Sequence, residues 1–79
     1  MNTALIIRTA RLELAKADAV QTDLENAFGE FDVSDCKMSD TYFEWKIWTY
    51  TLDTLNTATR IGRVLERNDV VLLGINEEK

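Results

Sequence analysis

The residues best suited to recognition chemistry are the aromatic side chains between positions 41 and 50. Both tryptophans and both tyrosines of the 79-residue chain lie there, together with one of its three phenylalanines. Aromatic side chains bury large flat surfaces, and tyrosine and tryptophan also carry a hydrogen-bond donor. Such residues are enriched at protein interfaces and often supply much of the binding energy. The segment therefore indicates binding.

Strand alternation would divide these residues between two faces, because successive side chains of a β-strand point to opposite sides. One face carries Phe43, Trp45 and Ile47. The other face carries Tyr42, Glu44, Lys46, Trp48 and Tyr50. A small sheet lines one core, so we expect Tyr42, Trp48 and Tyr50 to face solvent or a partner. A bulge in the strand would invert the assignment beyond it.

The inventory of reactive side chains argues against catalysis. The chain has no histidine and a single cysteine, so a zinc site or a catalytic triad of the usual kinds cannot be assembled. Carboxylate pairs such as Asp32 with Asp35 have a spacing that is common on solvated surfaces. The three glycines stand too far apart in the sequence to form a phosphate-binding loop. We therefore expect no enzymatic activity, no metal and no cofactor.

Composition is that of an ordinary globular chain. It is 46% apolar and 29% charged, which suits one domain with a modest core over residues 1–79. No apolar run approaches the roughly 20 residues of a membrane helix, and no segment resembles a secretion signal. We expect a cytoplasmic protein with no membrane partner. Cys36 has no partner for an internal disulfide, and we expect it to be semi-buried and unreactive.

Charge is distributed unevenly along the chain. The net charge is −5, which opposes nucleic-acid binding. Positions 18 to 44 hold eight carboxylates and one base, Lys37. A solvated face is the simpler interpretation of this acidic run. The alternative is a surface that engages the basic groove of another protein, with Asp32, Asp35 and Asp40 as a charged rim.

Hydrophobic periodicity predicts the order strand, helix, strand, strand, helix, strand. The predicted ranges are 3–14, 18–28, 31–37, 41–50, 53–68 and 70–75, with a polar tail from about 76. Strand 31–37 and strand 41–50 are expected to form a hairpin. Leu55, Ala58, either Ile61 or Gly62, and Leu65 form the expected apolar stripe of the second helix. Arg60, Arg63 and Arg67 recur along another side of that helix, near the end where cations are favoured.

Each predicted helix has two candidate start positions. The first helix is capped either at Thr9 or at Asp18, where Asp18 and Gln21 have capping-box spacing. The second choice is preferred because a strand at 41–50 needs a long neighbour, and because the two helices then have similar lengths. The second helix begins at Thr51 or Asp53. Gly29 should end the first helix with a positive φ. Gly62 costs the second helix about 1 kcal/mol relative to alanine, and it reflects either a close approach to the sheet or a tolerated defect.

This element order resembles that of the ferredoxin-like fold. The resemblance implies an α+β domain, a βαββαβ sandwich with a four-stranded antiparallel sheet and two helices on one face. The segments 4–7 and 70–73 are apolar on both sides, and strands of that kind are usually covered on both faces. The pattern offers no third helix to do so. We therefore expect a homodimer, or another protein partner, on the open face of the sheet.

Three families or types of protein offer functional comparisons. RNA-recognition motifs share the element order and stack bases on strand aromatics, but 41–50 lacks their basic residue followed by glycine. ACT-like regulatory domains carry a glycine-bearing loop before the first helix, whereas Gly29 follows it. In size and charge the chain is similar to acidic phage proteins that inhibit nucleic-acid enzymes. The sequence favours an acidic protein-interaction module of this inhibitor type, with an ACT-like ligand-binding dimer as the alternative.

Overall fold

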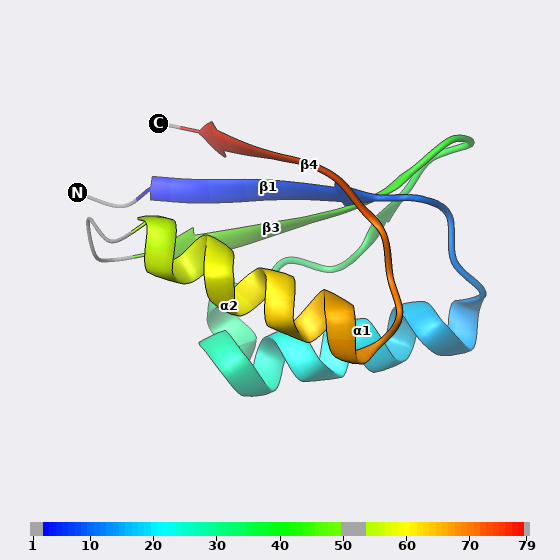
Figure 1. Cartoon of the computed structure of the whole chain (residues 1–79), viewed down its shortest axis with the longest axis horizontal. Helices are drawn as coiled ribbons and strands as arrows, with labels where there is room; N and C mark the ends of the chain where they lie inside the picture. The colour runs from blue at the N-terminus through cyan, green and yellow to red at the C-terminus, as the bar shows by residue number, and fades with distance from the viewer. Residues whose placement is uncertain (1–2, 50–53, 79) are drawn as a thin grey trace.

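The computed structural model describes residues 3–49 and 54–78, which form an α+β fold. The elements in chain order are β1 (Thr3–Thr9), α1 (Leu14–Phe28), the short 3₁₀ helix η1 (Glu30–Asp32), β2 (Lys37–Met38), β3 (Phe43–Thr49), α2 (Thr54–Arg67) and β4 (Leu72–Glu78). The four strands make one antiparallel sheet in the order β2-β3-β1-β4. Both α-helices lie on the same side of it (Figure 1).

The core lies between the sheet and the two helices. Its central strand, β1, pairs with β3 and β4, so that Ile7 stands opposite Trp45 on one side and Ile75 on the other. The core residues are Leu5, Ile7, Ala17, Val20, Leu24, Val33, Phe43, Trp45, Ile47, Ile61, Val64, Leu65 and Val70. The predicted inward face of β3 (Phe43, Trp45 and Ile47) is thus confirmed by burial.

The first strand is shorter than predicted. β1 ends at Thr9, opposite Phe43, the first residue of β3. A strand continued to Leu14 would have no neighbour there, and its backbone groups would lack partners in the sheet. The preferred boundary was therefore wrong. The alternative after Thr9 is closer, because α1 begins at Leu14.

The first helix begins one turn before its predicted cap. Ala17, Val20 and Leu24 are its buried residues, and this stripe carries the helix back past Asp18. The predicted capping box does not form, because Gln21 instead accepts a hydrogen bond from the buried indole of Trp45. The N-cap position makes no side-chain hydrogen bond. Packing, and not a cap, decides where this helix starts.

The helix ends follow the sequence more closely. Gly29 follows α1 with φ 98°, and its N–H donates to the carbonyl of Glu25 at 2.7 Å. Asn68 follows α2, and its Nδ2 donates to the carbonyl of Val64 at 2.9 Å. The positive φ at this second end falls on Asp69, at 57°. Both predicted stop signals are therefore confirmed. The predicted starts of α2 at Thr51 or Asp53 lie outside the described residues.

The second strand is much shorter than predicted. η1 occupies the start of the predicted range, and Phe31 within it is 90% exposed. Val33 makes a single bridge to Ile47, and only Lys37–Met38 pairs as a strand. Gly29, with its positive φ, leads directly into η1, which takes up the first positions of the predicted strand. The hairpin itself is confirmed, since β2 pairs with β3 antiparallel.

The last strand is an edge strand shifted toward the C-terminus. β4 runs to Glu78, which stands opposite Ala4, so the predicted polar tail from 76 is part of the sheet. The apolar run at 71–73, where the chain enters this edge strand, is exposed. In α2 the predicted stripe is wrong at Leu55, which is 79% exposed. The helix instead buries Val64 beside the predicted Ile61 and Leu65.

Candidate functional site

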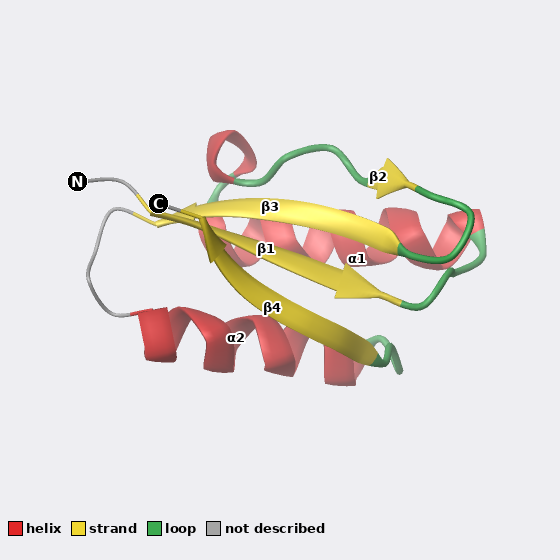
Figure 2. Ribbon diagram, turned by 90° about the horizontal axis from the view of Figure 1, so that it is seen from above, coloured by secondary structure: helices red, strands yellow, loops and turns green. Residues whose placement is uncertain are grey.

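The candidate site is the open face of the sheet, on the side away from the helices (Figure 2). The register places three rows of residues across β3, β1 and β4 on that face, namely Glu44–Arg8–Gly74, Lys46–Ile6–Asn76 and Trp48–Ala4–Glu78. Tyr42 immediately precedes β3 at the Arg8 end. Tyr42 and Trp48 therefore lie on the predicted outward face. Tyr50, the third predicted anchor, lies outside the described residues.

Two ion pairs cross this face. The Nε of Arg8 donates to Oε1 of Glu44 at 2.8 Å. Lys46 Nζ lies 3.1 Å from Oε2 of Glu78, and this pair reaches over β1 from β3 to β4. The hydrogen bond to Glu44 raises the pKa of Arg8 above its ordinary value. The face is therefore more charged than the apolar pattern of the sequence suggested.

Each cation also contacts an aromatic ring. The guanidinium carbon of Arg8 lies 4.3 Å from the centroid of the Tyr42 ring, and Lys46 Nζ lies 5.8 Å from that of Trp48. Such cation–π contacts restrict both side chains. Trp48 remains 36% exposed, whereas Tyr42 is half-buried. The face thus presents two aromatic side chains, each held by a cation.

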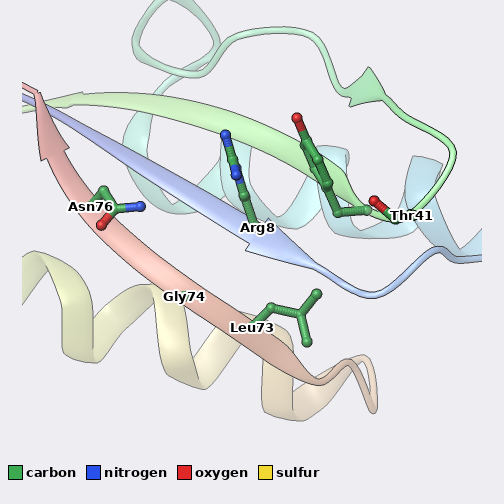
Figure 3. A pocket seen from close by; sticks show the side chains of 6 residues that line it. Arg8, Thr41, Leu73, Gly74 and Asn76 are labelled. Atoms are coloured by element: carbon green, nitrogen blue, oxygen red, sulfur yellow. The ribbon is translucent and has the colours of Figure 1, made fainter.

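A hollow of about 380 Å³ opens at the Arg8 end of the face (Figure 3). Arg8, Thr41, Tyr42, Leu73, Gly74 and Asn76 line it. Gly74 stands opposite Arg8 in the sheet. Because glycine has no side chain, the space beside the Arg8 guanidinium stays open. The pairing of β1 with β4 shifts register here, because Arg8 faces Gly74 and Thr9 faces Leu72. Leu73 is therefore the extra residue of a β-bulge, a feature common next to binding sites.

The predicted acidic rim lies elsewhere. Asp32 is half-buried in η1, Asp35 is exposed in the loop that follows, and Asp40 is exposed in the β2–β3 turn. This segment runs along the β2 edge of the sheet, whereas the hollow reaches across to β4 (Figure 2). Of the three, only Asp40 lies close in the chain to the hollow-lining residues Thr41 and Tyr42. The structure does not gather Asp32, Asp35 and Asp40 around the aromatic residues.

Sequence reasoning missed the residues that form the hollow on β1 and β4. Arg8, Gly74 and Asn76 come from opposite ends of the chain, and only strand pairing brings them together. One signal was present, because a glycine inside an apolar strand often marks a bulge or a close approach. Gly74 is such a residue, although a methyl group there would meet nothing within 4 Å.

The three arginines of α2 form a separate cluster. Arg60, Arg63 and Arg67 line a second hollow with Ala27 and Val64, between the two helices. Arg60 donates to the carbonyl of Ala27 in the last turn of α1 and lies 4.5 Å from the ring centroid of Phe28. A cation is favoured at this position because the last carbonyls of a helix lack helical partners. The contacts of Arg60 with Ala27 and Phe28 therefore serve to pack α2 against α1.

Two other kinds of feature, a metal site and a membrane-spanning helix, are not found among the described residues. Within 3–49 and 54–78, no three histidine, cysteine, aspartate or glutamate residues lie together so as to hold a metal ion. Neither described α-helix is long and apolar enough to cross a membrane. The chain matches no family model and no curated protein. The open face must therefore be interpreted from its own chemistry.

Proposed function

We propose that this chain is a protein-binding module whose recognition surface is the open face of the sheet. One observation carries the proposal: Trp48 and Tyr42 lie on the face opposite the helices, each beside a cation. Aromatic side chains that are already restrained lose little entropy on binding. The strand order and the two helical crossovers support the finer inference of a ferredoxin-like topology, in which one sheet face is left open.

The charges of this face suit specific recognition. The pairs Arg8–Glu44 and Lys46–Glu78 would surround a bound partner with both signs of charge, and pairs of this kind discriminate between partners more than they raise affinity. The net charge of −5 would attract a basic protein over longer distances. The finer proposal is that the partner belongs to a nucleic-acid-handling complex, whose basic groove would contact the acidic run along the β2 edge of the sheet, beside the open face.

Paired substitutions test the proposal. Trp48→Glu places a charge on one of the two aromatic residues of the proposed surface, whereas Leu14→Glu places one on an exposed apolar residue at the start of α1. Each tagged variant is used to co-purify proteins from the source cells, after circular dichroism shows that it is folded. We expect proteins retained by the wild type and by Leu14→Glu to be lost with Trp48→Glu. Identical sets from all three chains would overturn the proposal.

A second function is supported by the hollow beside Arg8. A hollow of about 380 Å³ lies within the size range of small-ligand sites. A small-ligand regulatory module would use it without any protein on the open face. Such a module should be stabilised by one metabolite, by about 2.7 kcal/mol at a hundredfold excess over Kd, whereas a protein-binding module needs no such ligand.

A further inference from the structure

The hollow on the open face has a lining that suits an anion. It contains one cation, Arg8, and three other side chains with a hydrogen-bond donor, Thr41, Tyr42 and Asn76. Its six lining residues include no aspartate or glutamate, although the chain as a whole is acidic. Arg8 and Asn76 project from neighbouring strands around the space above Gly74 (Figure 3). Donors from three segments thus surround one empty volume.

Arg8 is held in place before any ligand arrives. Its Nε is bound to Glu44 at 2.8 Å, and its guanidinium carbon lies 4.3 Å from the Tyr42 ring centroid. A guanidinium has five N–H donors, and the bond to Glu44 uses the one on Nε. The Nη groups remain as a planar fork of the kind that binds carboxylates through two parallel hydrogen bonds.

The charge beside the hollow selects the kind of anion. Glu44 already balances the charge of Arg8, and the hollow has no second lining cation, so the extra negative charge of a dianion such as phosphate would be left uncompensated. A carboxylate carries a single charge and matches the fork of Arg8. Leu73, which is exposed at the bulge, lines the β4 side of the hollow with an apolar surface. The lining therefore suits a carboxylate that carries an apolar group.

We infer that this hollow binds a carboxylate next to an apolar side chain, presented by the C-terminus of a peptide or by a small carboxylic acid. This inference rests on the proposed function, because it names the chemistry of a partner group bound on the same face. Arg8 holds the carboxylate, Asn76 and the two hydroxyls complete its hydrogen bonds, and Leu73 contacts the apolar group. Gly74 supplies the space.

The test is a titration of the isotope-labelled chain by nuclear magnetic resonance. The probes are N-acetyl-leucine and its neutral match, N-acetyl-leucinamide. We expect saturable shifts at the amides of residues 73–76 and at the Arg8 Nε–H with the acid and not with the amide. A third probe, the tripeptide acetyl-Gly-Gly-Leu, should bind more tightly than N-acetyl-leucine if the natural carboxylate belongs to a peptide, and less tightly if it belongs to a small acid.

Two glycine substitutions provide the matched control. Gly74→Leu fills the hollow, and a Cβ at that position has no contact within 4 Å that would disturb the fold. Gly62→Ala adds a Cβ with equally free surroundings in α2. We expect Gly74→Leu to weaken N-acetyl-leucine binding at least about tenfold, as loss of a fitted pocket does, and Gly62→Ala to leave it unchanged. Arg8→Gln, which keeps the side chain polar, should also abolish binding.

Three results would overturn the inference. They are equal shifts with the acid and the amide, no saturable shift with either acidic probe, and unchanged binding in Gly74→Leu or Arg8→Gln. Failure of the proposed function is distinguishable, because Trp48 belongs to another row of the face and does not line the hollow. A Trp48→Glu variant that loses no co-purified protein but still binds N-acetyl-leucine would reject the protein-binding function alone.

Discussion

Trp45 shows how a single polar contact places the largest side chain of the core. The indole is fully buried, and its Nε1 donates to Oε1 of Gln21 on α1 at 2.7 Å. Gln21 Nε2 in turn donates to the carbonyl of Ser34 at 3.0 Å. A buried N–H without a partner is costly, so this chain of bonds ties β3, α1 and the loop after η1 together. Trp48, three residues on, faces solvent and has no such role.

Replacing the two tryptophans by phenylalanine should separate these roles. Trp45→Phe removes the donor and leaves a small cavity, so we expect it to lower the free energy of unfolding by about 2 kcal/mol. Trp48→Phe should change it by less than about 0.5 kcal/mol, as surface substitutions do. Urea unfolding followed by circular dichroism measures both values. Equal losses would contradict the assignment of Trp45 to the core.

Cys36 should be a poor nucleophile at neutral pH. The thiol is half-buried, and burial raises its pKa, against a smaller opposite effect of a backbone hydrogen bond from Glu44. A raised pKa keeps the thiol protonated in the folded chain at a pH where the unfolded chain already forms thiolate. We expect disulfide reagents to label the folded chain more slowly than the urea-unfolded chain at pH 8.

The same shift sets a pH dependence for stability. Because the folded pKa lies above the unfolded one, the stabilisation is complete below the unfolded value and is lost as the pH rises through the folded value. A Cys36→Ser variant should therefore lose less stability than the wild type between pH 8 and pH 10. Equal losses, or faster labelling of the folded chain, would show that Cys36 is not shielded.

At the scale of elements, the glycines illustrate two different uses of one residue type. Gly62 lies inside α2 with nothing within 4 Å of a potential Cβ, so the close approach considered from the sequence does not occur. Gly29 follows α1 with φ 98°, a backbone conformation that other residues rarely adopt. One glycine is a tolerated defect of a helix, and the other is required by a turn.

Alanine substitutions should have opposite effects at these positions. Gly62→Ala should raise the free energy of unfolding by about 0.5–1 kcal/mol, because alanine loses less backbone entropy on folding. Gly29→Ala should lower it by about 1–2 kcal/mol, because a Cβ strains a residue with positive φ. Thermal unfolding of the two variants under one condition compares them directly. Destabilisation by Gly62→Ala would indicate a contact of α2 in solution.

For the whole molecule, the question is whether a second copy covers the open face. The Cα radius of gyration of the described structure is 11.5 Å, close to the roughly 11.6 Å of a compact 79-residue monomer from the size scaling. A compact dimer would approach about 15 Å by the same scaling. Burial of Trp48 and Ile6 would favour such a dimer, whereas desolvation of the two ion pairs would oppose it.

The homodimer prediction can be checked by small-angle X-ray scattering across a dilution series. If a second copy occupies the open face, the radius of gyration should rise with concentration toward about 15 Å, and Trp48→Glu should remain near the monomer value. The Leu14→Glu variant controls for added charge. A wild-type value near that of the monomer at every concentration would show that the prediction is wrong and that the face awaits another partner.

The sequence by itself determined the two faces of β3 and the C-terminal ends of the two helices. Alternation along a strand is a local property, so Phe43, Trp45 and Ile47 were separated from Trp48 without knowledge of the sheet. Gly29 and Asn68 likewise end their helices through backbone preferences of single residues. The element order and the α+β class followed from the same local periodicities.

Only the tertiary structure decided which residues meet on the open face. β1 stops at Thr9 because β3 begins opposite it, and β4 continues to Glu78 because β1 is there to pair with it. The hollow exists because pairing joins Arg8 to Gly74 across 66 positions of sequence. Strand register depends on contacts between distant segments, so no local pattern could have located this site.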